Sequence, residues 1–272
     1  MHFTKMHGLG NDYLYVYGEV PENIEELSIR LSERHFGAGS DGMIYISPSR
    51  MADFKMRIFN ADGSEAKMCG NGIRCVGKYV YDKGYTDKTY LEIETLSGIK
   101  TLQLHVICGK VKQVSVDMGK TECFEDMSVI VDGKQIALTP VSVGNPHAVI
   151  FVDNAEKEPI TVIGPIIEHD KNFPEGVNVE FVQVLNENAL RMRVWERGSG
   201  VTMACGTGAC ASVSAAVKKG YVKMNEFVTV KLDGGDLKIK VNEDGSVIMN
   251  GPAEFVYEGD TIECFQIKIT TT

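Results

Sequence analysis

Two short segments contain the residues of this chain that are best suited to chemistry. Cys69-Gly70-Asn71-Gly72 and Cys205-Gly206-Thr207-Gly208 each place a thiol in front of a glycine-rich turn. The residues that follow, 73–81 and 209–217, predict two buried helices that begin at these turns. Free backbone N–H groups and the helix dipole favour a thiolate at a helix N-terminus, so we expect a lowered pKa for both cysteines. The same N–H groups could hold a carboxylate beside each thiol.

The two turns belong to an internal repeat. Residues 56–85 align without a gap on residues 192–221, an offset of 136 that is half of the 272-residue chain. Eight of the 30 aligned positions are identical, against about two expected from ordinary residue usage. Gly10-Asn11 and Gly144-Asn145 extend the correspondence at nearly the same offset. We therefore expect two related halves, with one cysteine at the same place in each.

A pair of such turns predicts chemistry on the two faces of one carbon atom. Inversion of a stereocentre needs a base on one face and an acid on the other. If the halves face each other across a cleft, one cysteine as thiolate would remove an α-proton and the other as thiol would return one. Backbone N–H donors and exclusion of water would stabilise the carbanion. The alternative for each cysteine is a small apolar residue of the core, and we keep that interpretation for the other five.

Both halves are expected to contain short strands and helices. Alternating or β-branched runs predict strands at 13–17, 55–59, 102–106, 111–116, 148–152, 179–185, 191–195 and 228–232. Pro21 opens an amphipathic helix that is expected to end near Gly37. The predicted fold is α/β in the α+β sense, with two pseudo-symmetric halves, each a curved, barrel-like mixed or antiparallel sheet around a central buried helix. The first half would span residues 1–117 plus a C-terminal strand at 263–272, and the second half residues 118–262.

Composition narrows the possible partners. A net charge of −9 with scattered basic residues disfavours a nucleic-acid surface and favours a small-molecule partner. No apolar run approaches the ~18 residues that cross a bilayer, and no signal-peptide pattern opens the chain, so we expect a cytoplasmic protein away from membranes. Seven cysteines, an odd number, are then best interpreted as reduced thiols. No Cys-x-x-Cys pair is present, which disfavours a structural metal.

One motif suggests a nucleotide cofactor instead. Residues 206–211 match the G-x-G-x-x-A pattern of dinucleotide-binding proteins. No hydrophobic strand precedes the motif, and the equivalent residues 70–75 break the pattern. A nucleotide site is therefore the weaker interpretation.

Longer motifs resemble those of the diaminopimelate epimerase family. The likeness is carried by residues 68–75 (MCGNGIRC), 195–200 (WERGSG) and 204–209 (ACGTGA), and by 7–12 (HGLGND), 59–63 (FNADG) and 144–147 (GNPH), so that it spans the chain. Proline and hydroxyproline racemases share the two-cysteine plan but resemble Cys-Gly-His-Gly where this chain has Asn71. The resemblance implies interconversion of LL- and meso-2,6-diaminopimelate for lysine and peptidoglycan synthesis by a homodimer, without pyridoxal phosphate, metal or another cofactor.

The resemblance also implies roles for particular residues. Cys69 and Cys205 would be the base and acid. Backbone amides of Gly70, Asn71, Gly206 and Thr207 would hold the reacting carboxylate, and Asn11, Asn60, Asn145, Asn178, Glu196 and Arg197 would bind the rest of the substrate. His147 and Glu196 would tune the cysteines and the reacting amine. In isolation the asparagines are ordinary turn residues, the histidine a structural one and the arginine a surface charge.

Two departures and two further hypotheses stay open at this point. Gly42 stands where some family members carry a substrate-contacting glutamine, and Val201 where an acidic residue is expected. A racemase of another amino acid, of the proline, hydroxyproline or histidine type, would share the scaffold. A non-catalytic binding protein would share it as well.

Overall fold

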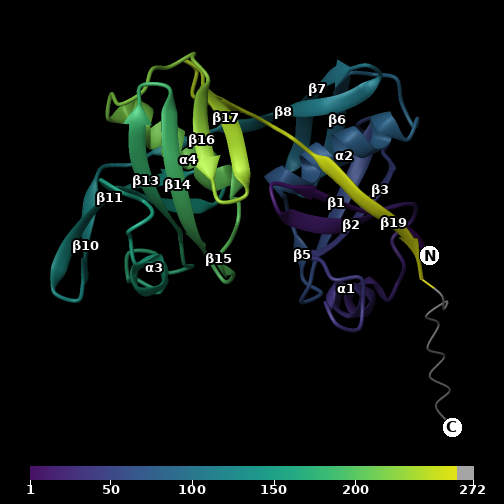
Figure 1. Ribbon diagram of the computed structural model, residues 1–272, viewed down its shortest axis with the longest axis horizontal. Coiled ribbons are helices and arrows are strands. Elements are labelled where there is room, and N and C mark those ends of the chain that lie inside the picture. Colours follow the sequence, from purple (N-terminus) through teal and green to yellow (C-terminus); the bar gives the residue numbers. More distant parts are fainter. Residues whose placement is uncertain (262–272) are drawn as a thin grey trace, which may run out of the picture.

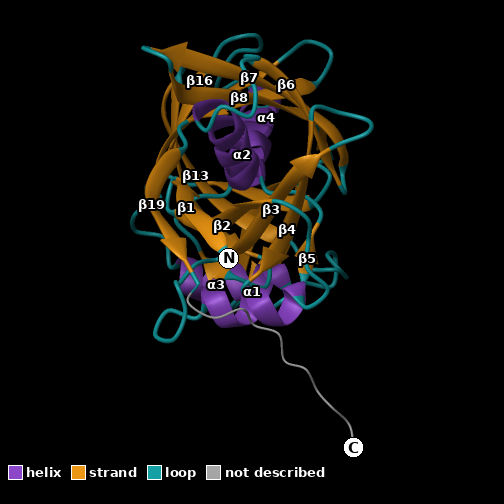
Figure 2. Cartoon of the chain, turned by 90° about the vertical axis from the view of Figure 1, so that its right-hand side faces the viewer, coloured by secondary structure: helices purple, strands orange, loops and turns teal. Residues whose placement is uncertain are grey.

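The sheet of this chain curls around each of two buried helices. Figure 1 shows two halves side by side, purple and blue elements in one and green elements in the other. Helices α2 (Gly70–Asp82) and α4 (Gly206–Lys218) lie inside the curved sheet in Figure 2, and α1 (Ile24–Ser32) and α3 (Ile160–Glu168) lie at its lower end. This computed structural model describes residues 1–261, so the strand predicted at 263–272 lies outside the described residues. The predicted fold class is confirmed.

The first half is a mixed sheet. Its strands are β1 (His2–Gly8), β2 (Asn11–Tyr17), β3 (Gly42–Pro48), β4 (Phe54–Asn60), β6 (Tyr90–Thr95), β7 (Gly98–Ile107) and β8 (Lys110–Lys120), and the short β5 (Glu65–Ala66) pairs with β4. The pairs β2–β3 and β4–β6 are parallel, and the other neighbours are antiparallel. The parallel pairs are those that span the chain connections through α1 and α2.

The second half repeats this arrangement. Its strands are β10 (Met127–Val131), β11 (Lys134–Ser142), β12 (Pro146–Phe151), β13 (Asn178–Asn186), β14 (Ala189–Glu196), β16 (Val228–Leu232), β17 (Gly235–Val241) and β18 (Ser246–Gly251), and β15 (Gly200–Val201) pairs with β14. Again only the pairs β12–β13 and β14–β16 are parallel. Both ends of α3 and α4 lie 136 residues after those of α1 and α2. The repeat therefore extends well beyond the segment that aligns by sequence.

Strand pairings at the junction join the two halves. β18 pairs with β8, which joins both halves into one sheet that has 19 strands within residues 1–261. The strand after β18, β19 (Glu254–Asp260), returns to pair with β1 and is the yellow crossing strand of Figure 1. In the equivalent place after β8, β9 (Glu122–Cys123) pairs with β11 of the second half. These exchanged pairings tie the halves to each other on both sides of their junction.

All eight predicted strands are present, but two helices differ from expectation. α1 ends at Ser32 rather than near Gly37, because Glu33 is extended (φ −60°, ψ 125°) and ends the helical path. α3 was not predicted, since Pro165 and Gly164 interrupt its pattern. Gly164 is needed there because a Cβ would lie 2.4 Å from the Trp195 ring. Within residues 1–261, no helix has the length and apolar character needed to span a bilayer.

Candidate active site

Both motif cysteines cap the buried helices in the same way. Cys69 is the N-cap of α2 and Cys205 is the N-cap of α4, each with an extended backbone. The Cys69 sulfur accepts a hydrogen bond from the Gly72 backbone N–H at 3.3 Å, and Cys205 accepts the equivalent bond from Gly208 at 3.3 Å. The predicted helix starts are therefore confirmed, and the thiols occupy equivalent positions in the repeat.

The two helices bring their first turns into contact. A Cβ built on Gly206 would lie 3.7 Å from the Cα of Gly70, and Met249 packs against both glycines. Asn71 Nδ2 donates to the carbonyl of Ala204 at 3.0 Å, which links α2 to the residue before Cys205. The first turns of α2 and α4, each with a cysteine at its cap, therefore lie together at the junction of the halves.

Polar side chains of β2 surround Cys69. Its thiol donates to Asn11 Oδ1 at 3.3 Å, and Asn11 Nδ2 donates to Asp41 Oδ2 at 2.7 Å. The backbone N–H of Asp12 donates to the same Asp41 oxygen at 3.0 Å. Burial and the electrostatic effect of Cys69 raise the pKa of the Tyr13 hydroxyl. Asp41 thus orients the amide that holds the thiol.

A longer polar chain leads to Cys205. Its sulfur lies 3.5 Å from Thr207 Oγ1, and Asn145 Nδ2 lies 3.4 Å from that hydroxyl. His147 Nε2 is 3.1 Å from Asn145 Oδ1, and His147 Nδ1 is 2.6 Å from Glu180 Oε1. The chain ends on a carboxylate that is fully buried together with the imidazole.

Glu196 is shared by the two thiols. Its carboxylate raises the pKa of Cys205 electrostatically and accepts a hydrogen bond from the Thr202 hydroxyl. Its negative charge also raises the pKa of Cys69. Burial raises the pKa of the Glu196 carboxyl itself. The two cysteines therefore share one electrostatic environment.

The lowered pKa expected for both cysteines is wrong. Burial raises the pKa of Cys69, and hydrogen bonds from the backbone of Gly72 and Asn71 only partly oppose this. Burial, followed by the charges of Glu196 and Glu180, holds the pKa of Cys205 well above its ordinary value. Loss of water around a thiolate outweighs the favourable helix terminus. Both side chains are therefore thiols near neutral pH.

Of the remaining predicted residues, Asn178 and Arg197 form an outer group. Asn178 Oδ1 accepts from the backbone N–H of Arg197 at 2.9 Å, and Asn178 Nδ2 lies 3.4 Å from the Pro146 carbonyl. The exposed Arg197 guanidinium donates to the Glu175 carbonyl at 2.9 Å. Asn60 lies at the end of β4, equivalent to Glu196 at the end of β14, and donates to Ser64 Oγ at 3.1 Å. Asn178 thus brings the Arg197 loop to the start of β12.

The two departures from the family pattern have different consequences. Gly42 has φ +150°, and a Cβ would lie 2.1 Å from the Phe59 carbonyl oxygen. No side chain, and hence no glutamine, fits on this backbone. Val201 lies in β15 opposite Trp195 and is 41% exposed, so other side chains could stand there.

Three site residues were missed by the sequence reasoning: Tyr13, Asp41 and Glu180. Glu180 had a detectable signal, because it is an acid inside the apolar run Val179-Glu180-Phe181-Val182 of a strand expected to be buried. The other two had none, since both lie near turns where polar residues are ordinary.

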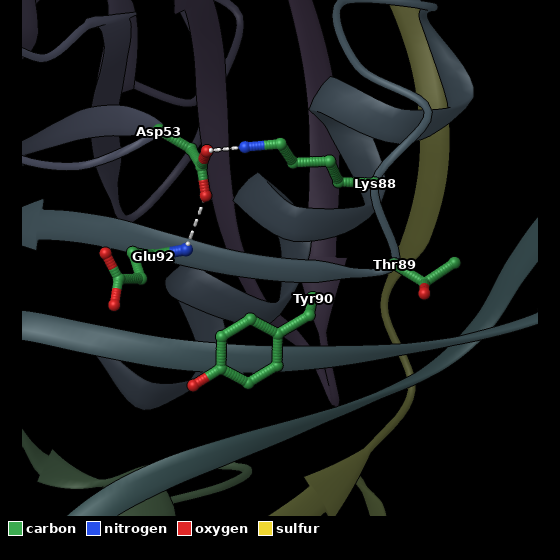
Figure 3. A pocket seen from close by; sticks show the side chains of 5 residues that line it. All are labelled: Asp53, Lys88, Thr89, Tyr90 and Glu92. Carbon is green, nitrogen blue, oxygen red and sulfur yellow. Dashed lines mark hydrogen bonds and ion pairs between the residues drawn. The ribbon is translucent and has the colours of Figure 1, made fainter.

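A separate surface pocket lies away from these residues. It is lined by Asp53, Lys88, Thr89, Tyr90 and Glu92 (Figure 3). Asp53 accepts from Lys88 Nζ at 2.6 Å and from the Glu92 backbone N–H at 2.9 Å. These bonds hold the start of β6 against the turn before β4, which accounts for the cluster structurally.

Several known proteins are similar to this chain in sequence. The sequence matches the family "Diaminopimelate epimerase" over residues 3–124 and 139–256. A diaminopimelate epimerase of Acetivibrio thermocellus is 53% identical over 276 residues, covering 96% of this chain and 98% of that protein. A protein of the same name from Bacillus subtilis is 49% identical over 275 residues, covering 94% and 97%.

Solved structures agree on the fold at much lower identity. A phenazine biosynthesis protein of the PhzF family from Bacillus anthracis has a TM-score of 0.79 at 15% identity, covering 97% of this chain and 99% of that chain. A probable proline racemase from Agrobacterium radiobacter has a TM-score of 0.76 at 16% identity, covering 98% and 94%. These two likenesses concern the fold alone. The family match and the close relatives together show that this chain belongs to the diaminopimelate epimerase family.

Proposed function

We propose that this chain interconverts LL- and meso-2,6-diaminopimelate by moving the α-proton between Cys69 and Cys205, in the synthesis of lysine and peptidoglycan precursors. Relatives that share about half of its residues carry the name of this reaction. The observation that carries the proposal is the pair of thiols that cap two helices whose first turns are in contact.

The helix termini supply the binding site for the reacting carboxylate. The backbone N–H groups of Gly70 and Asn71 in α2, and of Gly206 and Thr207 in α4, belong to the first turns and lack partners within their helices. Two helix N-termini that meet favour an anion between them. They also stabilise the negative charge that moves onto the carboxylate when the α-proton leaves.

The substrate itself helps to generate the thiolate. Burial keeps both thiols protonated near neutral pH, and Glu196 raises the pKa of each. An α-ammonium group beside Glu196 would pair with that carboxylate and offset its charge. One cysteine can then release its proton to solvent, and its thiolate takes the α-proton from one face and leaves a carbanion. The other cysteine donates its proton to the opposite face and becomes the thiolate, so that each turnover exchanges the two roles.

The outer group would hold the distal end of the substrate. Arg197 offers a guanidinium suited to a second carboxylate. The Asn11 amide contacts Cys69 and the Asn145 amide contacts Thr207 beside Cys205, and Asn60 and Asn178 would complete the distal site. A cofactor-free reaction, a homodimeric state and a cytoplasmic location stay predictions from the sequence and the resemblance.

Loss of either thiol tests the proposal. We expect Cys69→Ser and Cys205→Ser each to abolish epimerisation of LL-diaminopimelate and the incorporation of solvent deuterium at its α-carbon. Cys108→Ser, which changes an exposed cysteine in the β7–β8 turn, is the matched control and should keep full activity. Exchange in the wild type that does not exceed the protein-free rate, and is unchanged in both serine variants, would instead favour a binding protein.

Substrate choice needs its own measurement. Turnover of diaminopimelate is compared with that of proline, hydroxyproline, histidine and glutamate. Faster racemisation of any of these four would replace the proposed substrate while leaving the two-thiol mechanism in place.

A further inference from the structure

Glu180 is a buried acid directly beneath the first turn of α4. Its side chain and that of His147 are both 0% exposed. A Cβ on Gly208 would lie 2.7 Å from Glu180 Oε1, so the carboxylate fills the space that this glycine leaves open. Glu180 Oε2 has no hydrogen-bond partner among residues 1–261. A carboxylate buried with one oxygen unpaired is costly, and such a group calls for an explanation.

The equivalent position in the first half shows which side chain the packing under the helix requires. Strand register puts Ile44 at the position of Glu180, and Tyr13 at the position of His147. A Cβ on Gly72 would meet Ile44 Cδ1 at 2.6 Å, just as one on Gly208 would meet Glu180. An isoleucine therefore satisfies the packing under the equivalent helix. The acid serves something that the Cys205 side needs and the Cys69 side does not.

The geometry connects Glu180 to Cys205 through His147. Val149 lies opposite Glu180 in the parallel pair β12–β13, so His147, two residues before Val149, points to the same face. Glu180 Oε1 is 2.6 Å from His147 Nδ1, which places a proton on Nδ1 because a carboxylate can only accept. Nε2 is then the nitrogen turned to Asn145, whose amide reaches the Thr207 hydroxyl beside Cys205.

We propose that Glu180 is a positioning residue for Cys205: it keeps the proton on Nδ1 of His147, so that the state of Nε2 alone determines which way the chain His147–Asn145–Thr207 directs its hydrogen bonds at the thiol. The nitrogen that carries the proton is set by the partner of the ring. When Nε2 is also protonated, Asn145 turns its oxygen to the ring and its N–H₂ to Thr207, whose hydroxyl then donates to a Cys205 thiolate. When Nε2 is bare, the amide is reversed and the Cys205 thiol donates to Thr207.

Few other charged groups face this chain. Glu180 comes from β13, His147 from β12, Glu196 from β14 and Cys205 from the start of α4, and Glu196 acts electrostatically on His147 and Glu180. Among these groups, Glu196 is the one that raises the pKa of Cys69. Removal of Glu180 should therefore affect Cys205 more than Cys69.

Glu180→Gln tests the proposal with two readouts. The amide can present either an N–H or an oxygen to Nδ1, so the ring is no longer held in one form. We expect kcat to fall by about 10- to 100-fold, the loss that is typical when the partner that orients a metal-binding histidine is removed. KM should change little, because Glu180 does not line the proposed carboxylate or distal sites. The pH profile of kcat should shift relative to that of the wild type.

The second readout is independent of activity. ¹⁵N NMR of histidine-labelled protein should show Nδ1 of His147 as the protonated nitrogen in the wild type and a mixture of forms in Glu180→Gln. This arm does not rest on the proposed function, whereas the kinetic arm does, so the two can fail separately. An unchanged His147 signature, or an unchanged kcat with an altered signature, would overturn the positioning role.

Two further variants separate positioning from folding. Glu180→Asp keeps a carboxylate and should restore part of the lost kcat and the single His147 form, and it serves if the glutamine variant does not fold. Asp82→Asn removes an acid from another buried ion pair, with Lys78 at 2.9 Å, far along α2 from the thiol. It should lower stability without moving the pH profile, and a matching shift in Asp82→Asn would refute the assignment.

Discussion

The backbone at Gly42 offers a quantitative test of why the substrate-contacting glutamine seen in some family members is absent here. Gly42 is buried at the start of β3, with φ +150° and the Phe59 carbonyl oxygen 2.1 Å from the place a Cβ would take. That separation is far inside the about 3.5 Å at which non-bonded atoms attract best. The substitution is Gly42→Ala, and its control is Gly98→Ala in the β6–β7 turn, where φ is +95° and nothing lies within 4 Å of the added Cβ.

The two variants share one cost and differ in another. A non-glycine residue at such φ values costs about 1–3 kcal/mol. At Gly42 the clash must also move the end of β4, which is held by pairing of Gly42 with Asn60 and by a hydrogen bond from Ser28 Oγ to the Phe59 oxygen at 3.0 Å. Loss of two such bonds adds about 2 kcal/mol. We therefore expect Gly42→Ala to lower the free energy of unfolding by about 3–5 kcal/mol, and Gly98→Ala by about 1–3 kcal/mol.

Urea unfolding of both variants and the wild type measures the difference. The activity of Gly42→Ala should fall as well, because the same movement displaces Asn60 at the edge of the site. If Gly42→Ala is as stable as Gly98→Ala, the strand end yields without cost, and steric exclusion does not explain the missing glutamine.

Three further outcomes follow from the site. Iodoacetamide at pH 8 should alkylate Cys69 faster than Cys205, because Cys69 is less buried and the charges of Glu196 and Glu180 add to the raised pKa of Cys205. Peptide mass spectrometry measures the order of alkylation, and the reverse order would contradict this prediction. Mild peroxide should join Cys69 to Cys205 and abolish activity until a thiol reductant restores it, and a disulfide found only between other cysteines would count against their proximity. Burial raises the folded-state pKa of Glu196 above its ordinary value, so the wild type loses stability as pH rises through the raised value. Glu196→Gln cannot ionise and lacks this loss. The unfolding free energy of Glu196→Gln relative to that of the wild type should therefore grow from pH 4 to pH 8 rather than stay constant.

Local sequence patterns predict much of the architecture. Cysteine before a glycine-rich turn, followed by small apolar residues, is enough to predict where α2 and α4 begin, because capping and burial patterns act within a few residues. The repeat then predicts two equivalent halves, and eight strands follow from their alternating or β-branched runs.

Long-range packing decided the rest. α3 forms in spite of Pro165 and Gly164 because Trp195 of β14 packs against it, and no local pattern contains that contact. The pKa of each thiol follows from how much water the assembled halves exclude and from acids on other strands, so the local helix terminus predicted the wrong direction. Glu180 and Ile44 occupy equivalent places, yet only the folded sheet brings the acid to His147 and the start of α4. Distances between residues far apart in the chain depend on the whole fold, and the chemistry of this site depends on those distances.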